Sequence, residues 1–111
     1  MAYDEELADR IREAVQDVDG VTEKRMFGGL AFLVHGNMAV AASGQGGLML
    51  RVDPAETDEL TARPHARPMV MRGREMDGWL RVDAEGVDAD HELAEWVALG
   101  VARARVLPPK P

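Results

Sequence analysis

The sequence predicts an α+β domain in which helices cover one face of an antiparallel sheet. Three observations carry this prediction: apolar residues at helical spacing near both ends of the chain, short apolar runs between glycine-rich turns, and prolines that interrupt the middle. With 111 residues and 46% hydrophobic content, the chain has enough material for one core. We therefore expect a single domain over residues 1–107 and a frayed, proline-rich tail over residues 108–111.

The first expected element is a helix over residues 4–18. Its apolar residues recur at steps of four, four and three and so form one face: Leu7, Ile11, Val15 and Val18. Gly20 stands just beyond this pattern and marks the end of the helix.

A four-strand antiparallel meander is expected next, over residues 23–52. Its short apolar runs are separated by Gly28-Gly29 and by the turn segments 35–37 and 43–47. The two adjacent glycines predict a bulge, a sharp bend or a close backbone approach, because only glycine reaches positive φ without a steric cost.

The last strand of the meander alternates apolar residues with Met49 and Arg51, so we expect one buried face and one that is at least partly wet. A short helix should follow, with Asp53 as its N-cap and proline at the first helical position. It must end near Arg63, because Pro64 and Pro68 each hold the preceding residue in an extended conformation.

The remaining chain predicts a two-strand hairpin and a long C-terminal helix. Residues 69–71 and 79–82 read as strands that pair around the turn-rich segment 73–78. From Asp88 onward a helical apolar stripe begins, and Pro108-Pro109 ends it.

Composition excludes several classes of protein. The net charge of −7 argues against a generic nucleic-acid binder, and the absence of cysteine excludes disulfides and thiolate metal sites. The N-terminus is acidic where a signal peptide would be basic, and no apolar run approaches the roughly 20 residues that span a bilayer. We expect a cytoplasmic protein that is neither secreted nor embedded in a membrane.

No catalytic, metal-binding or cofactor-binding residue is predicted. The three histidines lack the short separations of zinc motifs, and the only serine, Ser43, sits in a glycine-rich turn without a nucleophile elbow. The glycine clusters run into strands, whereas a phosphate cradle would run into a helix. The methionines could form an adaptable partner surface, although core filling is the plainer interpretation: Met26, Met38, Met49, Met69, Met71 and Met76.

Charge is segregated along the chain. The acids concentrate on the predicted terminal helices, whereas the bases lie on strands and loops. Phosphate contacts, a carboxylate partner and mutual pairing with the acidic helices are all compatible with the basic residues. The candidate anion-binding or partner-binding residues are Lys24, Arg25, Arg51, Arg67, Arg72 and Arg74.

Several motifs resemble the N-terminal domain of the TfoX (Sxy) competence-regulator family, in its stand-alone form. They cover nearly the whole chain in order: Arg25-Met26-Phe27-Gly28-Gly29, Gly36-Asn37-Met38, residues 47–52, Arg67-Pro68-Met69, Gly78-Trp79 and residues 107–110. The resemblance implies an α+β fold with a central antiparallel sheet and a non-enzymatic role in regulating transcription. It makes Met26, Phe27, Gly28, Gly29 and Trp79 determinants of the fold.

Two hypotheses of function follow. In the first, a regulatory domain binds a protein partner, one of the transcription machinery, without catalysis. In the second, nucleic acid or a phosphorylated small molecule binds a basic face of the sheet carrying Lys24, Arg25, Arg51, Arg67 and Arg72. Salt dependence separates them, because phosphate binding weakens steeply with added salt. A free edge strand would also allow a homodimer.

Overall fold

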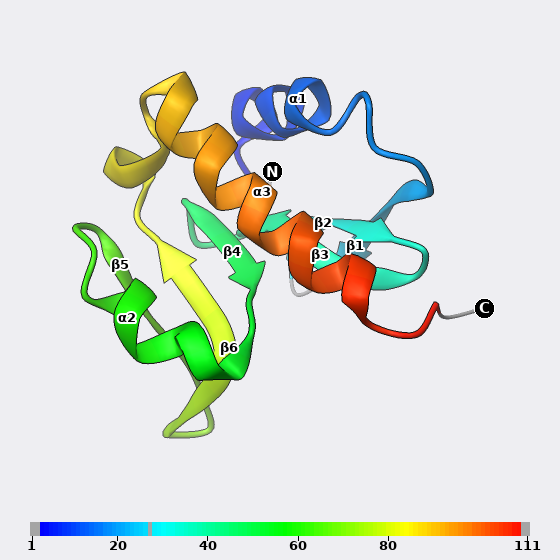
Figure 1. Cartoon of the computed structure of the whole chain (residues 1–111). Coiled ribbons are helices and arrows are strands. Elements are labelled where there is room, and N and C mark those ends of the chain that lie inside the picture. Colours follow the sequence, from blue (N-terminus) through cyan, green and yellow to red (C-terminus); the bar gives the residue numbers. More distant parts are fainter. Residues whose placement is uncertain (1–2, 27, 110–111) are drawn as a thin grey trace.

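The helices and strands follow the expected order along residues 3–26 and 28–109, the part of the chain that the computed structural model describes (Figure 1). Phe27, one of the expected fold determinants, lies outside the described residues. The described elements are α1 (Glu5–Ala14), β1 (Val21–Met26), β2 (Gly29–Val34), β3 (Asn37–Ala42), β4 (Leu48–Arg51), η1 (Pro54–Glu56), α2 (Thr57–Thr61), β5 (Ala66–Met71), β6 (Arg74–Val82), η2 (Ala84–Val87) and α3 (Asp90–Val106).

All six described strands belong to one antiparallel sheet with the order β1-β2-β3-β4-β6-β5. The meander supplies the first four strands in sequence order. The hairpin then joins through its second strand, so β6 pairs with β4 while β5 forms an edge. Meander and hairpin thus form one continuous sheet, and the predicted α+β architecture is confirmed.

The three helices cover one face of this sheet, as expected, and α3 lies across its middle strands (Figure 1). They share a single core with the sheet, to which α1 contributes Ile11, α2 contributes Leu60 and α3 contributes Trp96. The approach of α3 is close, because a Cβ at Gly100 would lie 2.5 Å from the carbonyl oxygen of Ala39 on β3. A side chain at this position would therefore force the helix away from the sheet.

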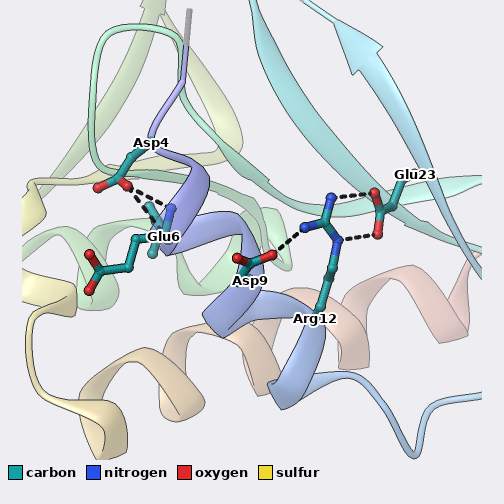
Figure 2. Close-up of polar contacts among 6 residues, drawn as sticks. Asp4, Glu6, Asp9, Arg12 and Glu23 are labelled. Atoms are coloured by element: carbon teal, nitrogen blue, oxygen red, sulfur yellow. Dashed lines mark hydrogen bonds and ion pairs between the residues drawn. The ribbon is translucent and has the colours of Figure 1, made fainter. Parts of the chain in front are cut away.

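Helix α1 is fixed at its start and at its last turn (Figure 2). The Asp4 carboxylate accepts hydrogen bonds from two backbone amides of the first turn, which is the usual role of an N-cap. Near the other end, Arg12 binds Asp9 on the same helix and Glu23 on β1. The hydrogen bonds from the Arg12 guanidinium lower the pKa of Glu23, with burial as a smaller opposing effect.

The two adjacent glycines have different structural roles. Gly28 has φ of +76° in the turn between β1 and β2, a conformation that favours glycine. Gly29 instead marks a close backbone approach, because a Cβ there would lie 2.3 Å from the carbonyl oxygen of Ala42 on β3. The bend and the close approach predicted from the sequence are therefore both present, whereas the bulge between β2 and β3 falls later, at Phe32/Leu33.

The hairpin differs from its prediction. Its turn consists of only Arg72 and Gly73, both with positive φ, and Met71 pairs with Arg74. Strand β6 therefore begins at Arg74, inside the segment 73–78 that was expected to be a turn. Gly78, with φ of +84°, lies within the strand where the register shifts. The polar and glycine-rich composition of this segment marks an irregular strand.

The helix boundaries also differ from expectation, and α1 ends at Ala14, before the expected end at residue 18. Asp53 caps a 3₁₀ turn through a bond from the Ala55 amide, and the short helix that follows ends at Thr61. The long helix begins at Asp90, because residues 84–87 form a separate 3₁₀ turn. In both places a 3₁₀ turn precedes the α-helix, as is common at helix ends, where 3₁₀ and α hydrogen bonds compete.

Candidate functional site

The face of the sheet opposite the helices, here called the open face, carries a second apolar cluster. Its buried members are Ala31, Met38, Ala41, Met49 and Met69, with Met26 and Trp79 packed at its margin. None of these residues belongs to a described helix, so the strand side chains shield one another. Long, flexible methionine side chains suit this purpose, and Met49 is only 5% exposed. The face that was expected to be partly wet is thus mostly apolar at its centre.

A hollow of about 480 Å³ opens on this face beside β5. Strand β5 forms one wall, and Met49, Arg81 and the turn at Ser43 form the rest. In the sheet register Met49 lies opposite Arg81, and Arg81 lies opposite Arg67. The floor of the hollow therefore holds a row of one methionine and two arginines that crosses three adjacent strands.

Arg81 is half-buried at the centre of this row. Its Nη2 donates a hydrogen bond to the hydroxyl oxygen of Ser43 at 2.9 Å. Burial lowers the pKa of Arg81, the neighbouring charge of Arg67 lowers it further, and Asp83 partly offsets both effects. Two like charges directly opposite each other on paired strands are unfavourable, so the row carries an electrostatic cost.

One carboxylate accompanies the two guanidinium groups. Arg67 forms an ion pair with Asp83, with 2.9 Å between Nη2 and Oδ1. Among the described residues, Arg81 forms no such ion pair. The group of Arg67, Arg81 and Asp83 therefore has one positive charge left over.

Ser43 belongs to the site although it serves the turn as well. It is 3% exposed, and its hydroxyl oxygen accepts one bond from the Gln45 amide at 3.1 Å and another from Arg81. A hydroxyl has two acceptor positions and one donor proton. Both acceptor positions are thus occupied, and none of the hydrogen bonds found among the described residues is donated by this hydroxyl.

The candidate basic residues do not form one patch. Lys24 and Arg25 lie on β1, at the edge of the sheet far from β5, and strand alternation places them on opposite faces. Arg72 and Arg74 are exposed at the tip of the β5–β6 hairpin. Of the six candidates, Arg67 alone lines the hollow.

Arg51 lies next to the hollow, in the neighbouring row of the open face. Its guanidinium carbon is 5.2 Å from the centre of the Trp79 ring, which it faces across the β4–β6 pair. This contact is a cation–π interaction on the open face. Within the described structure, Arg67 is the sole candidate base in an ion pair, and its partner Asp83 lies outside the helices. The acidic helices pair instead with Arg10 and Arg12.

Sequence reasoning missed the two residues at the centre of the site. Arg81 was assigned to a strand without a role, although its alternation with Leu80 and Val82 places it on the face opposite the core. Ser43 was interpreted only as a turn residue. They come together through the pairing of β4 with β6, which places Arg81 opposite Met49 and beside the β3–β4 turn that contains Ser43.

Over residues 3–26 and 28–109, no group of three or more histidine, cysteine or carboxylate side chains is arranged to hold a metal ion. None of the helices described has the length and apolar character needed to cross a bilayer.

Comparison with known proteins gives one result. The family model described as the TfoX N-terminal domain matches residues 13–104, which include the motif at 25–29, Ser43 and both arginines of the row. Neither the curated proteins nor the solved structures contain a match. At the level of the family, this is a regulatory, competence-related domain. The match spans most of the chain, and the chain belongs to the TfoX N-terminal domain family.

Proposed function

We propose that this domain regulates by binding a protein partner on the open face of its sheet, without catalysis. The partner presents an extended segment in which a carboxylate lies beside apolar side chains. The observation that carries this proposal is the hollow beside β5, in which Arg67 and Arg81 adjoin methionine side chains. Family membership supports the regulatory role, and the hollow supports the chemistry of the partner.

The apolar part of this surface favours a protein over a nucleic acid. Val70 and Met71 on β5 are 57% and 38% exposed, and they line the hollow together with Met69. Protein interfaces are enriched in methionine and arginine, and apolar side chains of a partner would gain by covering these residues. A phosphodiester backbone has few apolar groups that could cover these side chains. The net charge of −7 also repels nucleic acid.

The bases of the open face support a second candidate, the binding of nucleic acid or a phosphorylated ligand. Arg51 and Arg81 lie on the same face of adjacent strands, and Arg67 follows on β5. Guanidinium groups bind phosphate as readily as carboxylate. On this alternative, affinity would fall steeply with added salt, whereas an interface built partly on apolar contacts would keep most of its affinity.

A displayed library of random peptides tests the first proposal without a known partner. We expect peptides selected on the domain to be enriched in aspartate or glutamate next to apolar residues, and to lose binding to the variant Arg81→Gln. Selection that yields no enriched sequence, or only basic sequences, would refute the proposal.

Titration of the same domain with a short DNA duplex at low and moderate salt tests the alternative. Salt-sensitive NMR shifts at Arg51, Arg67 and Arg81 would favour nucleic acid over a protein partner.

A second copy of the chain is the remaining occupant of the open face. Sedimentation that depends on protein concentration in the parent but not in Met71→Asp would show that a second copy occupies the open face. This result would overturn the proposal of a different partner.

A further inference from the structure

The arginine pair on the floor of the hollow is costly for the folded chain on its own. Arg67 and Arg81 are directly opposite on β5 and β6, and Arg81 is half-buried. Like charges in this arrangement destabilise a sheet, and partial burial adds a desolvation cost. An anion bound between them would offset both costs by its attraction to the two guanidinium groups. Part of the free energy that the chain loses here on folding would therefore be recovered when an anionic ligand binds.

The hydrogen-bonding groups around the pair point to the same kind of ligand. Ser43 has both acceptor positions filled and one proton left to donate. Arg81 uses Nη2 for Ser43, and a guanidinium has five N–H donors in a planar fork. Donors therefore outnumber acceptors at the floor of the hollow in the described structure. A group with two acceptor oxygens in one plane matches such a fork.

The charge count distinguishes a carboxylate from a phosphate. Asp83 already neutralises one guanidinium through its contact with Arg67. The leftover charge of one is balanced by a monoanion, whereas a phosphate near its dianionic form would leave excess negative charge beside Asp83. The site as built therefore favours a carboxylate.

The side chains that line the hollow, and its volume, indicate which kind of group carries the carboxylate. Met49 lies opposite Arg81 in the same row, and Met69 borders the hollow. A volume of about 480 Å³ falls within the range of small-ligand sites, about 300–1,000 Å³. An apolar group of the size of a leucine side chain would rest against the methionines while its carboxylate meets Arg81.

We infer that Arg81, Arg67 and the hydroxyl of Ser43 form a receptor for a single carboxylate borne by an apolar group. The carboxylate is either that of a peptide or that of a free organic acid, since both offer the same chemistry. This inference deepens the proposed function, on which it rests, by naming the group that the partner inserts.

The test is an NMR titration of ¹⁵N-labelled domain with N-acetyl-leucine, with N-acetyl-leucinamide as the matched neutral probe. We expect saturable shifts at the amides of Ser43 and Arg81 and at the Arg81 Nε–H with the acid, and none with the amide. Arg81→Gln should weaken binding at least about tenfold, as expected for loss of a charge-assisted contact. Arg105→Gln, an exposed arginine on α3, is the matched control and should bind like the parent.

Inorganic phosphate at equal ionic strength separates the two anions. If phosphate binds more tightly than N-acetyl-leucine, the carboxylate assignment is wrong. Equal binding of acid and amide, or full binding by Arg81→Gln, would also overturn it.

A stability measurement separates a receptor from a merely structural arginine. We expect the variant Arg81→Met to have the same or a higher melting temperature, because the substitution removes the like-charge pair and extends the methionine cluster. The same variant should no longer bind N-acetyl-leucine. A large fall in melting temperature would assign Arg81 to structure and refute the receptor.

Peptides identify the source of the carboxylate. Preference for a C-terminal acid over its amide indicates a chain end, and preference for internal aspartate indicates a side chain. Binding of N-acetyl-leucine without any selected peptide would sustain the receptor and refute the protein partner. If the selected peptides bind Arg81→Gln as well as the parent, the receptor is refuted and the protein partner is sustained.

Discussion

Replacement of Gly29 by alanine tests whether the glycine pair is required by close packing of strands. The backbone of Gly29 is ordinary, with no positive φ, so a methyl group costs nothing through its own torsion angles. The new Cβ would nevertheless lie 2.3 Å from the carbonyl oxygen of Ala42 and 3.1 Å from the amide nitrogen of Gly44. Both are backbone atoms, which cannot swing aside as a flexible side chain would.

The magnitude follows from the movement required. The Cβ must retreat beyond 3.0 Å from Ala42, and the neighbouring pair Leu30 and Ala42 must separate with it. Overpacking of this kind costs about 1–3 kcal/mol. Loosening one or two ladder hydrogen bonds adds about 1 kcal/mol each. Alanine recovers about 0.4–1 kcal/mol by restricting the unfolded chain. We expect a net loss of about 1–5 kcal/mol in the free energy of unfolding.

Thermal unfolding followed by circular dichroism measures this loss as a fall of about 4–20 °C in the melting temperature, at about 4 °C per kcal/mol for a domain of this size. Gly73→Ala is the control, because no atom lies within 4 Å of its added methyl. Its cost is confined to positive φ, about 1–2 kcal/mol. If Gly29→Ala melts no lower than Gly73→Ala, the close-approach argument is wrong.

Two further predictions concern the helices. Gly100→Ala should lower the free energy of unfolding in urea by up to about 2 kcal/mol, because overpacking against β3 costs about 1–3 kcal/mol and the gain in helix propensity returns about 1 kcal/mol. A stabilised variant would contradict the close packing of α3 on the sheet. Arg12→Gln should return the pKa of Glu23 to its ordinary range in a carboxyl NMR titration. Since the folded pKa of Glu23 is lowered, its contribution to stability is present above its unfolded pKa and is lost as the pH falls through the folded pKa, so parent and variant should converge in acid.

The elements that the sequence predicted well are those that local chemistry decides. The turn between β2 and β3 is His35-Gly36, with φ of 50° and 85°, as a two-residue hairpin turn requires. The apolar spacing of α1 likewise places Ile11 in the core. In each case, neighbouring residues contain the whole of the information.

The open face was harder to foresee because its burial depends on partners that are distant in sequence. Met49 alternates with core residues and could equally have faced water. It is buried in a cluster with Met38 and Ala41 on β3 and Met69 on β5. No periodicity within one strand records such contacts, which are a property of the assembled sheet.

The candidate site depends on a single irregularity in the hairpin. From the turn, Met71 pairs with Arg74, and a regular ladder would continue until Arg67 lay opposite Gly78. Between Pro68 and Met69 the register instead moves by three residues, so that Arg67 lies opposite Arg81. An odd shift exchanges the two faces of a strand relative to its neighbour. The same irregularity that made the segment 73–78 resemble a turn therefore creates the arginine pair and, with it, the surface on which a partner is proposed to bind.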